Sequence, residues 1–89
     1  MRVVLTVIGQ DKVGIIAGVS NTLAECNINI ININQNIMQG FFNMVLIADM
    51  SAANVSLQEA KDKFHVLGEK LGVEIRMQSE DIFKAMHRV

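Results

Sequence analysis

The sequence lacks several features on which common classes of protein depend. It contains a single cysteine, Cys26, so no internal disulfide can form, and this usage is typical of a reducing compartment. Tryptophan and tyrosine are absent, and the four phenylalanines offer little surface on which nucleic-acid bases could stack. The eight basic and nine acidic residues give a net charge of −1 and form no basic stripe. We therefore expect no direct binding of nucleic acid.

Metal-ligand clusters and membrane-spanning segments are also missing from the sequence. His65 and His87 are isolated, and no Cys, His, Asp or Glu cluster has the spacing of metal ligands, so we expect no metal and no cofactor. The uncharged stretch over residues 27–48 is interrupted by Asn and Gln side chains and by Gly40, which argues against a membrane span. No charged and then apolar leader precedes the first strand-like residues. The expected location is the cytoplasm.

Apolar side chains are abundant instead. They make up 51% of the 89 residues, whereas charged residues make up only 19%. A chain of this length predicts one domain over residues 1–89, and such a domain buries only about 60–65% of its unfolded surface. The apolar content exceeds what a small two-layer domain can easily hide. We therefore expect a self-associating surface, as in a homodimer.

The hydrophobic pattern alternates between strand and helix periods along the chain. It predicts strands over 2–8, 28–39, 41–50 and 73–78, and helices over 14–26 and from Ser56 to Gly72, followed by a short helix capped by Ser79. This β-α-β-β-α-β order predicts an α+β, ferredoxin-like sandwich, in which two helices cover one face of an antiparallel four-stranded sheet.

Apolar stripes identify the expected core faces. In the first helix the stripe consists of Ile15, Ile16, Val19, Leu23 and Cys26. In the strand over 41–50 the core face runs through Phe42, Met44, Leu46, Ala48 and Met50. The opposite face of that strand still carries large apolar side chains and needs partial cover from a partner: Phe41, Val45 and Ile47. In the C-terminal helix the apolar side consists of Ile82, Phe83 and Met86.

The strand over 28–39 lies at an edge of the sheet in this topology. Natural edges are protected by Lys, Pro, bulges or short length, but this strand is long and carries no charge. We therefore expect it to pair with the same strand of a second copy, through an interface that includes Ile31, Asn32, Ile33, Asn34 and Gln35. The apolar alternation slips between Ile30 and Ile31, which predicts a bulge there.

The segment between the first strand and the first helix is the main candidate for a binding site. The strand stops at Gly9, Asp11 stands where an N-cap is expected, and Gly14 begins the helix. Such a turn directs backbone N–H groups and the positive end of the helix dipole at one point, which suits an anion such as a carboxylate. No side chains there have the pattern of a catalytic centre. We expect the segment to hold a ligand rather than transform it.

Two stretches of the chain resemble an ACT domain: Ile8-Gly9-Gln10-Asp11-Lys12-Val13-Gly14-Ile15, and Leu23-Ala24-Glu25 followed by Ile28-Asn29-Ile30. More narrowly, the chain is similar to small stand-alone ACT proteins akin to the regulators of the glycine cleavage system. The resemblance covers nearly the whole chain. It implies homodimers or larger assemblies that bind a small ligand, often an amino acid, at the subunit interface.

Family positions carry over to particular residues of this chain. Asp11 matches the polar residue that begins the family's loop, and Gly14 matches its helix-starting glycine. Asn29 matches the asparagine that contacts the ligand in amino-acid-binding members, and polar positions on the following strand match Asn32 and Gln35. These matches are what the resemblance implies for the site.

Each of these residues also has a purely structural interpretation. Asp11 could serve only as the N-cap that accepts a helix amide, and Gly14 could be required only by close approach to the neighbouring strand. Asn29 could hydrogen-bond only the turn, and Lys12 could be a solvated loop charge instead of attracting a carboxylate. Val13 stands where the family usually has proline, whose ring would fix φ at about −65°, so the loop is expected to be more flexible.

The sequence therefore predicts a non-catalytic regulatory module that binds a small metabolite, above all an amino acid, as a homodimer or higher homo-oligomer. Its expected ligand contacts are Asp11, Lys12, Val13, Gly14, Ile15 and Asn29. The alternative is an interaction module without a ligand, whose dimer or sheet face docks another regulatory protein. An acylphosphatase-like hydrolase is the least favoured interpretation, because the first loop offers Lys12 but no arginine to cradle a phosphate.

Overall fold

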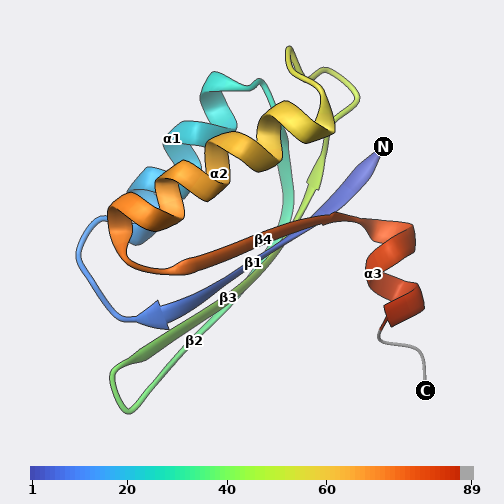
Figure 1. Cartoon of the computed structure of the whole chain (residues 1–89). Helices are drawn as coiled ribbons and strands as arrows, with labels where there is room; N and C mark the ends of the chain where they lie inside the picture. Colours follow the sequence, from blue (N-terminus) through green and yellow to red (C-terminus); the bar gives the residue numbers. More distant parts are fainter. Residues whose placement is uncertain (87–89) are drawn as a thin grey trace.

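A computed structural model describes residues 1–86 of the chain as a four-stranded antiparallel sheet with three helices. The elements in chain order are β1 (Arg2–Gln10), α1 (Ile15–Glu25), β2 (Asn29–Met38), β3 (Phe41–Asp49), α2 (Leu57–Leu71), β4 (Glu74–Ser79) and α3 (Glu80–Met86). The strand order is β2-β3-β1-β4, and α1 and α2 lie together on one face of the sheet (Figure 1). This architecture confirms the predicted ferredoxin-like sandwich.

The core lies between the sheet and the two helices. The five residues predicted for the core face of β3 and its end are all buried: Phe42, Met44, Leu46, Ala48 and Met50. From α1, Ile15, Val19 and Leu23 reach this core, and Cys26 is buried at the end of the helix. The prediction for Ile16 is wrong, because its side chain is 43% exposed. A residue next to buried Ile15 lies about 100° around the helix and leaves the buried stripe.

Local sequence signals set both ends of α2. Ser56 and Glu59 form a capping box, in which Ser56 Oγ accepts the Glu59 N–H at 3.1 Å and Glu59 Oε1 accepts the Ser56 N–H at 3.0 Å. The helix ends at Gly72, whose φ of 71° lies in the left-handed region that favours glycine. Both predicted boundaries are confirmed.

The short helix α3 begins as predicted but is only partly packed. Ser79 Oγ accepts the Ile82 N–H at 3.3 Å and so acts as the cap. Figure 1 shows α3 beyond the end of β4, apart from the α1–α2 layer. Phe83 is half-buried, whereas Ile82 and Met86 are exposed, so the predicted apolar side is buried only in part. His87 lies outside the described residues.

Strand β2 occupies one edge of the sheet, as predicted, and every residue from Ile31 to Met38 is exposed. Its register with β3 shifts between Ile30 and Asn32, which confirms the bulge. Beyond the bulge the asparagines lie on the face without α1 and α2, at positions 32, 34 and 36, whereas Gln35 lies on the helix-facing side. Within residues 1–86, no helix has the length and apolar character needed to cross a membrane.

Candidate ligand site at the β1–α1 loop

The loop between β1 and α1 leaves the first turn of α1 without a side-chain cap. Gly14 is the N-cap residue, with φ 95°, and no side chain caps the helix there. The interpretation of Asp11 as the N-cap is therefore wrong, because it lies three residues before Gly14, outside the first turn. The Gly14 carbonyl accepts the Gly18 N–H at 2.8 Å and closes the first turn. The three preceding N–H groups, at residues 15–17, point out of the helix end without intrahelical partners.

The predicted loop residues around the helix start differ in exposure and in the contacts that they make. Asp11 and Val13 are exposed, and the Asp11 backbone N–H donates to the Gly40 carbonyl at 2.8 Å, which joins the loop to the β2–β3 turn. A β-carbon at Gly14 would meet no atom within 4 Å, so close approach to a neighbouring strand is not why glycine stands there. Its positive φ is the reason. Ile15 is 1% exposed, so its side chain belongs to the core and only its backbone can face a ligand.

The exposed Lys12 side chain reaches the end of α2. Its Nζ lies 2.8 Å from the position that a β-carbon of Gly72 would occupy. Gly72 is the C-cap of α2, where the helix dipole is negative and favours a cation. The interpretation of Lys12 as a purely solvated loop charge is therefore incomplete, because its ammonium also lies beside the C-cap of α2.

Asn29 lies at the opposite end of the sheet from this loop. It is paired with Asp49, which is itself paired with Arg2, whereas the loop follows Gln10 at the other end of β1. Eight strand residues at about 3.3 Å each separate the two ends, or about 26 Å. One copy of the chain therefore does not bring Asn29 and Asp11 together.

Neighbouring asparagines, rather than Asn29, hold the turn around the start of β2. Asn27 Nδ2 donates to the Ala52 carbonyl at 2.8 Å, and Asn54 Nδ2 donates to the Glu25 carbonyl at 3.0 Å. Asn27 also adopts a left-handed conformation with φ 56°, as predicted for a residue that ends a helix. The side chain of Asn29 takes no part in these bonds, so its interpretation as a turn residue is wrong. Asn54 was not singled out from the sequence, because only the folded chain brings it beside α1.

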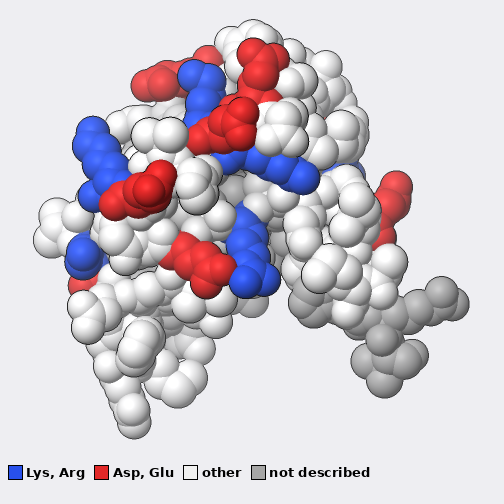
Figure 2. Space-filling view, in the orientation of Figure 1, with Lys and Arg blue, Asp and Glu red and all other residues white. Residues whose placement is uncertain are grey.

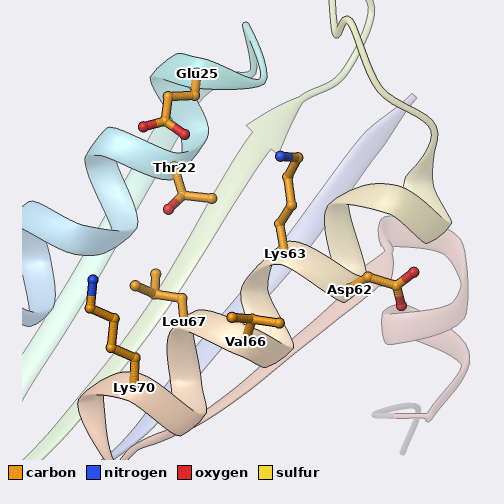
Figure 3. A pocket seen from close by; sticks show the side chains of 7 residues that line it. All are labelled: Thr22, Glu25, Asp62, Lys63, Val66, Leu67 and Lys70. Atoms are coloured by element: carbon orange, nitrogen blue, oxygen red, sulfur yellow. The ribbon is translucent and has the colours of Figure 1, made fainter.

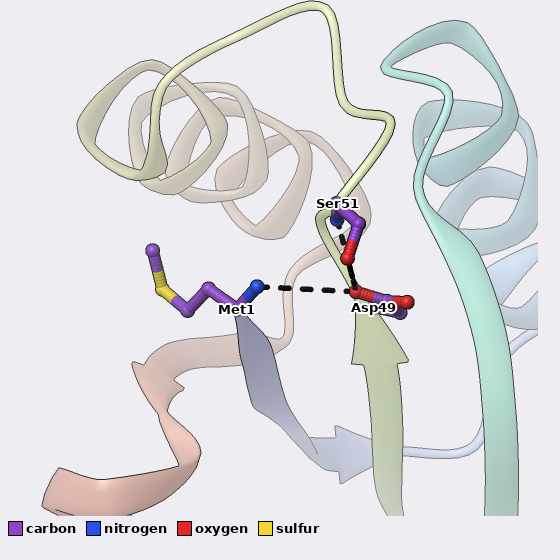
Figure 4. Close-up of polar contacts among 3 residues, drawn as sticks. All are labelled: Met1, Asp49 and Ser51. Carbon is purple, nitrogen blue, oxygen red and sulfur yellow. Dashed lines mark hydrogen bonds and ion pairs between the residues drawn. The ribbon is translucent and has the colours of Figure 1, made fainter.

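A small polar cluster adjoins Asn29 at its end of the sheet (Figure 4). Asp49 Oδ1 accepts hydrogen bonds from the Ser51 N–H at 2.9 Å and from Ser51 Oγ at 2.6 Å. The N-terminal ammonium of Met1 lies 4.0 Å from the same oxygen. The Ser51 side chain and backbone, followed by the positive N-terminus and Arg2, hold the pKa of Asp49 below its ordinary value. Asp49 therefore stays ionised near neutral pH.

Charged side chains are unevenly distributed over the surface. Figure 2 shows them over the upper and middle parts of the molecule, including the helical layer, while the projecting end of the β2–β3 hairpin carries none. A groove of about 420 Å³ lies between α1 and α2 (Figure 3), where Lys63, Lys70 and Glu25 rim an apolar wall formed by Val66 and Leu67. This groove contains none of the predicted ligand contacts. The part of the chain that the structure describes gathers no group of three or more His, Cys, Asp or Glu side chains that could hold a metal.

Comparison with known proteins agrees with this fold. A UPF0237 protein of Clostridium acetobutylicum is 52% identical over 89 residues, which is 100% of both chains. The solved structure of an ACT domain protein from Streptococcus pneumoniae is 37% identical, covers 98% of each chain and has a TM-score of 0.81. The regulatory subunit of aspartate kinase from Thermus thermophilus is 24% identical over 86% of this chain and 50% of that one, with a TM-score of 0.67, and shares the fold. A family model described as "ACT domain" matches residues 1–78, and the chain belongs to the ACT domain family.

Proposed function

We propose that this protein is a non-catalytic regulatory module that binds a small amino acid between two copies of the chain. The observation that carries the proposal is the long, uncharged edge of β2, whose hairpin end is joined to the β1–α1 loop by the Asp11 N–H and the Gly40 carbonyl. Family membership supports a regulatory role, as does the shared fold of an aspartate kinase regulatory subunit.

The two edges of the sheet differ in how well they are protected. β4 has only six residues and carries an ion pair in which Arg76 Nη2 lies 2.8 Å from Glu74 Oε1. β2 has ten residues, no charge and a continuous exposed length. On its helix-facing side Ile33 and Ile37 are 42% and 54% exposed, because α1 does not extend over the hairpin end. An edge of this kind favours pairing with another strand.

Antiparallel pairing of β2 with β2 of a second copy would unite the two separated parts of the predicted site. A two-fold axis near the strand centre sets the Asn29 end of one strand beside the Met38 end of the other. The Met38 end adjoins Gly40 and, through it, Asp11. The dimer would then hold two sites, each made of Asp11 and the start of α1 of one copy and Asn29 of the other.

The chemistry of each such site suits a zwitterion. The uncapped N–H groups of α1, with the positive end of the helix dipole, would bind the α-carboxylate. Exposed Asp11 would bind the α-ammonium, and Asn29 would bind either that group or the side chain. About ten ligand atoms at about 0.5–0.8 kcal/mol each give about −5 to −8 kcal/mol, hence dissociation constants from high to low micromolar.

A panel of the twenty amino acids tests the ligand by thermal shift, with calorimetry on any that bind. An amino acid at about 100 times its dissociation constant should stabilise the protein by about 2.7 kcal/mol, a rise of several degrees. Asp11→Ala and Asn29→Ala should each weaken binding about tenfold, the loss of one hydrogen bond to a charged group. The matched controls Asp62→Ala and Asn21→Ala, at exposed helical positions, should not. A flat panel, or unchanged binding in both site variants, would contradict the proposed function.

Sedimentation equilibrium tests the assembly through β2. Asn34→Lys places a charge in the middle of the exposed edge, so that two lysines would meet near the two-fold axis. We expect a dimer for the unaltered chain and a large loss of dimer for this variant. Gln58→Lys, on the exposed face of α2, adds the same charge and should leave the mass unchanged. A monomeric unaltered protein, or a variant that assembles normally, would refute the pairing.

The exposed apolar side chains on the other sheet face favour a second candidate, a module that docks another protein. Ile8, Met38 and Phe41 are exposed, and the half-buried Val45 and Ile47 lie on the same face of β3. A partner protein that binds equally well with and without amino acids would favour this candidate. A partner whose binding changes with the amino acid would instead support a metabolite-dependent regulator.

A further inference from the structure

We infer that Lys12 is a positioning residue, which fixes the β1–α1 loop against the end of α2 and does not itself contact the ligand. The inference rests on the proposed function only where it concerns the effect of Lys12 on ligand binding. Its effect on the loop can be measured without any ligand.

The end of β1 and the loop that follows it are held between two turns that are distant in the sequence. On one side the backbone of Gly9 packs directly on Val73, because a β-carbon at Gly9 would lie 2.7 Å from Val73 Cγ1 and 3.2 Å from Val73 Cα. On the other side the Asp11 N–H donates to the Gly40 carbonyl in the β2–β3 turn. The loop thus connects the α2–β4 turn with the hairpin at the exposed sheet edge.

Lys12 completes the first of these attachments. Its side chain is exposed and extends to the α2–β4 turn, where Nζ lies beside Gly72, next to the residue on which Gly9 packs. The N–H groups of Gly72 and Val73 both donate to the carbonyl of Gly68 and so leave the later carbonyls of α2 without these two donors. The last carbonyls of a helix carry the negative end of its dipole, which gives this point a negative potential. We therefore expect the negative end of α2 to favour the Lys12 ammonium at this point.

This placement separates the two charges of the loop. The Asp11 side chain is exposed and its backbone N–H is bonded to the hairpin, whereas the ammonium of Lys12 lies against Gly72 in the α2–β4 turn. The carboxylate of an amino acid at the uncapped end of α1 would then be bound by backbone N–H groups, with Lys12 acting only through the conformation of the loop. Replacing Lys12 should loosen the loop without removing a ligand contact.

Hydrogen exchange of the Asp11 amide, measured by NMR on the unliganded protein, tests the inference. This amide is protected by its bond to the Gly40 carbonyl, so its exchange reports opening of the loop. In Lys12→Met we expect exchange about 2- to 5-fold faster, the factor that corresponds to loss of a cation at a helix C-terminus. Lys12→Arg should restore the original rate. Lys70→Met, which removes the same charge from the last turn of α2, should leave the rate unchanged.

Gly72→Ala supplies a second, independent test. The β-carbon of the new alanine would displace the Lys12 ammonium, so Gly72→Ala alone should accelerate exchange of the Asp11 amide. In a Lys12→Met background the ammonium is already gone, and the additional acceleration should be smaller. The strain of a left-handed alanine is present in both backgrounds and cancels in this comparison. Equal effects in the two backgrounds, or no effect of Lys12→Met on exchange, would overturn the inference.

Binding measurements distinguish this inference from the proposed function. If an amino acid binds, Lys12→Met should lower its affinity by the same 2- to 5-fold factor by which it accelerates exchange of the Asp11 amide. Lys12→Arg should restore the affinity. A much larger loss would mean that Lys12 contacts the ligand directly and would overturn the inference. If no amino acid binds the unaltered chain, the proposed function fails, and the exchange measurements still decide the role of Lys12.

Discussion

The contact between Gly9 and Val73 gives a sharp prediction for stability. A β-carbon at Gly9 would lie 2.7 Å from Val73 Cγ1, 3.0 Å from Val73 Cβ and 3.2 Å from Val73 Cα. Carbon atoms in favourable contact are about 3.5–4.0 Å apart. Rotation of the valine can relieve the first contact, but the last involves the backbone, so β1 or the α2–β4 turn must shift. We expect Gly9→Ala to destabilise the fold by about 1–3 kcal/mol, the usual cost of overpacking.

A double-mutant cycle isolates the contact from other effects of the substitution. Val73 is 9% exposed, and Val73→Ala alone should cost about 1.5 kcal/mol for two lost methyl groups, with a further cavity term. In the double variant the new methyl group at position 9 enters the space left by the valine. The combined loss should therefore be at least about 1 kcal/mol smaller than the sum of the single losses. Relief stays incomplete, because the Cβ and Cα of residue 73 remain close.

Urea unfolding at one fixed protein concentration measures these free energies, since any self-association would make stability depend on concentration. Gly40→Ala is the matched control. Its φ of 83°, which Gly9 does not share, disfavours alanine, but a β-carbon there would meet nothing within 4 Å. Its loss should add to that of Val73→Ala without coupling. A Gly9→Ala protein as stable as the unaltered chain, or additive effects at positions 9 and 73, would refute the packing described here.

Three further predictions follow from single contacts. Ser56→Ala removes the capping-box acceptor of α2 and should cost about 0.5–2 kcal/mol, visible as a lower thermal midpoint, whereas an unchanged midpoint would contradict the cap. Bonds from the backbone and side chain of Ser56 lower the pKa of Glu59, and those from Ser51 lower the pKa of Asp49, so these carboxylates protonate more easily in the unfolded chain. Stability should therefore fall as the pH drops below about 5, and less steeply in Glu59→Gln, as acid titration of unfolding would reveal. Cys26 is 1% exposed and should react with a thiol reagent only as fast as the protein opens, so fast labelling of the folded protein would contradict its burial.

Sequence patterns predicted the elements well where a local physical rule was sufficient. Three features each depend on only a few neighbouring residues, and all three are confirmed: the alternation on β3, the Ser56–Glu59 cap and the left-handed end of α2 at Gly72. The bulge between Ile30 and Asn32 also followed from the alternation, because a slip of one residue turns every later side chain to the other face.

The candidate site was harder to predict, because its geometry depends on backbone conformation. Asp11 was predicted to be the cap because its residue type is common at N-caps. The N-cap is instead Gly14, whose φ of 95° only the folded backbone shows. The preference for glycine there was visible in the sequence, but its conformational cause was not. Lys12 could not be placed at all, because a flexible loop side chain has no periodicity that reports its neighbours.

Periodicity, caps and charge along the chain were sufficient to predict the order of strands and helices, the core faces and the unprotected edge at β2. Which distant segments meet became known only from the folded chain. It brought Gly9 onto Val73, Lys12 beside Gly72 and Asp11 to Gly40, and it left Asn29 at the far end of the sheet. Such contacts depend on strand direction and register, which are fixed by the packing of the whole domain rather than by neighbouring residues.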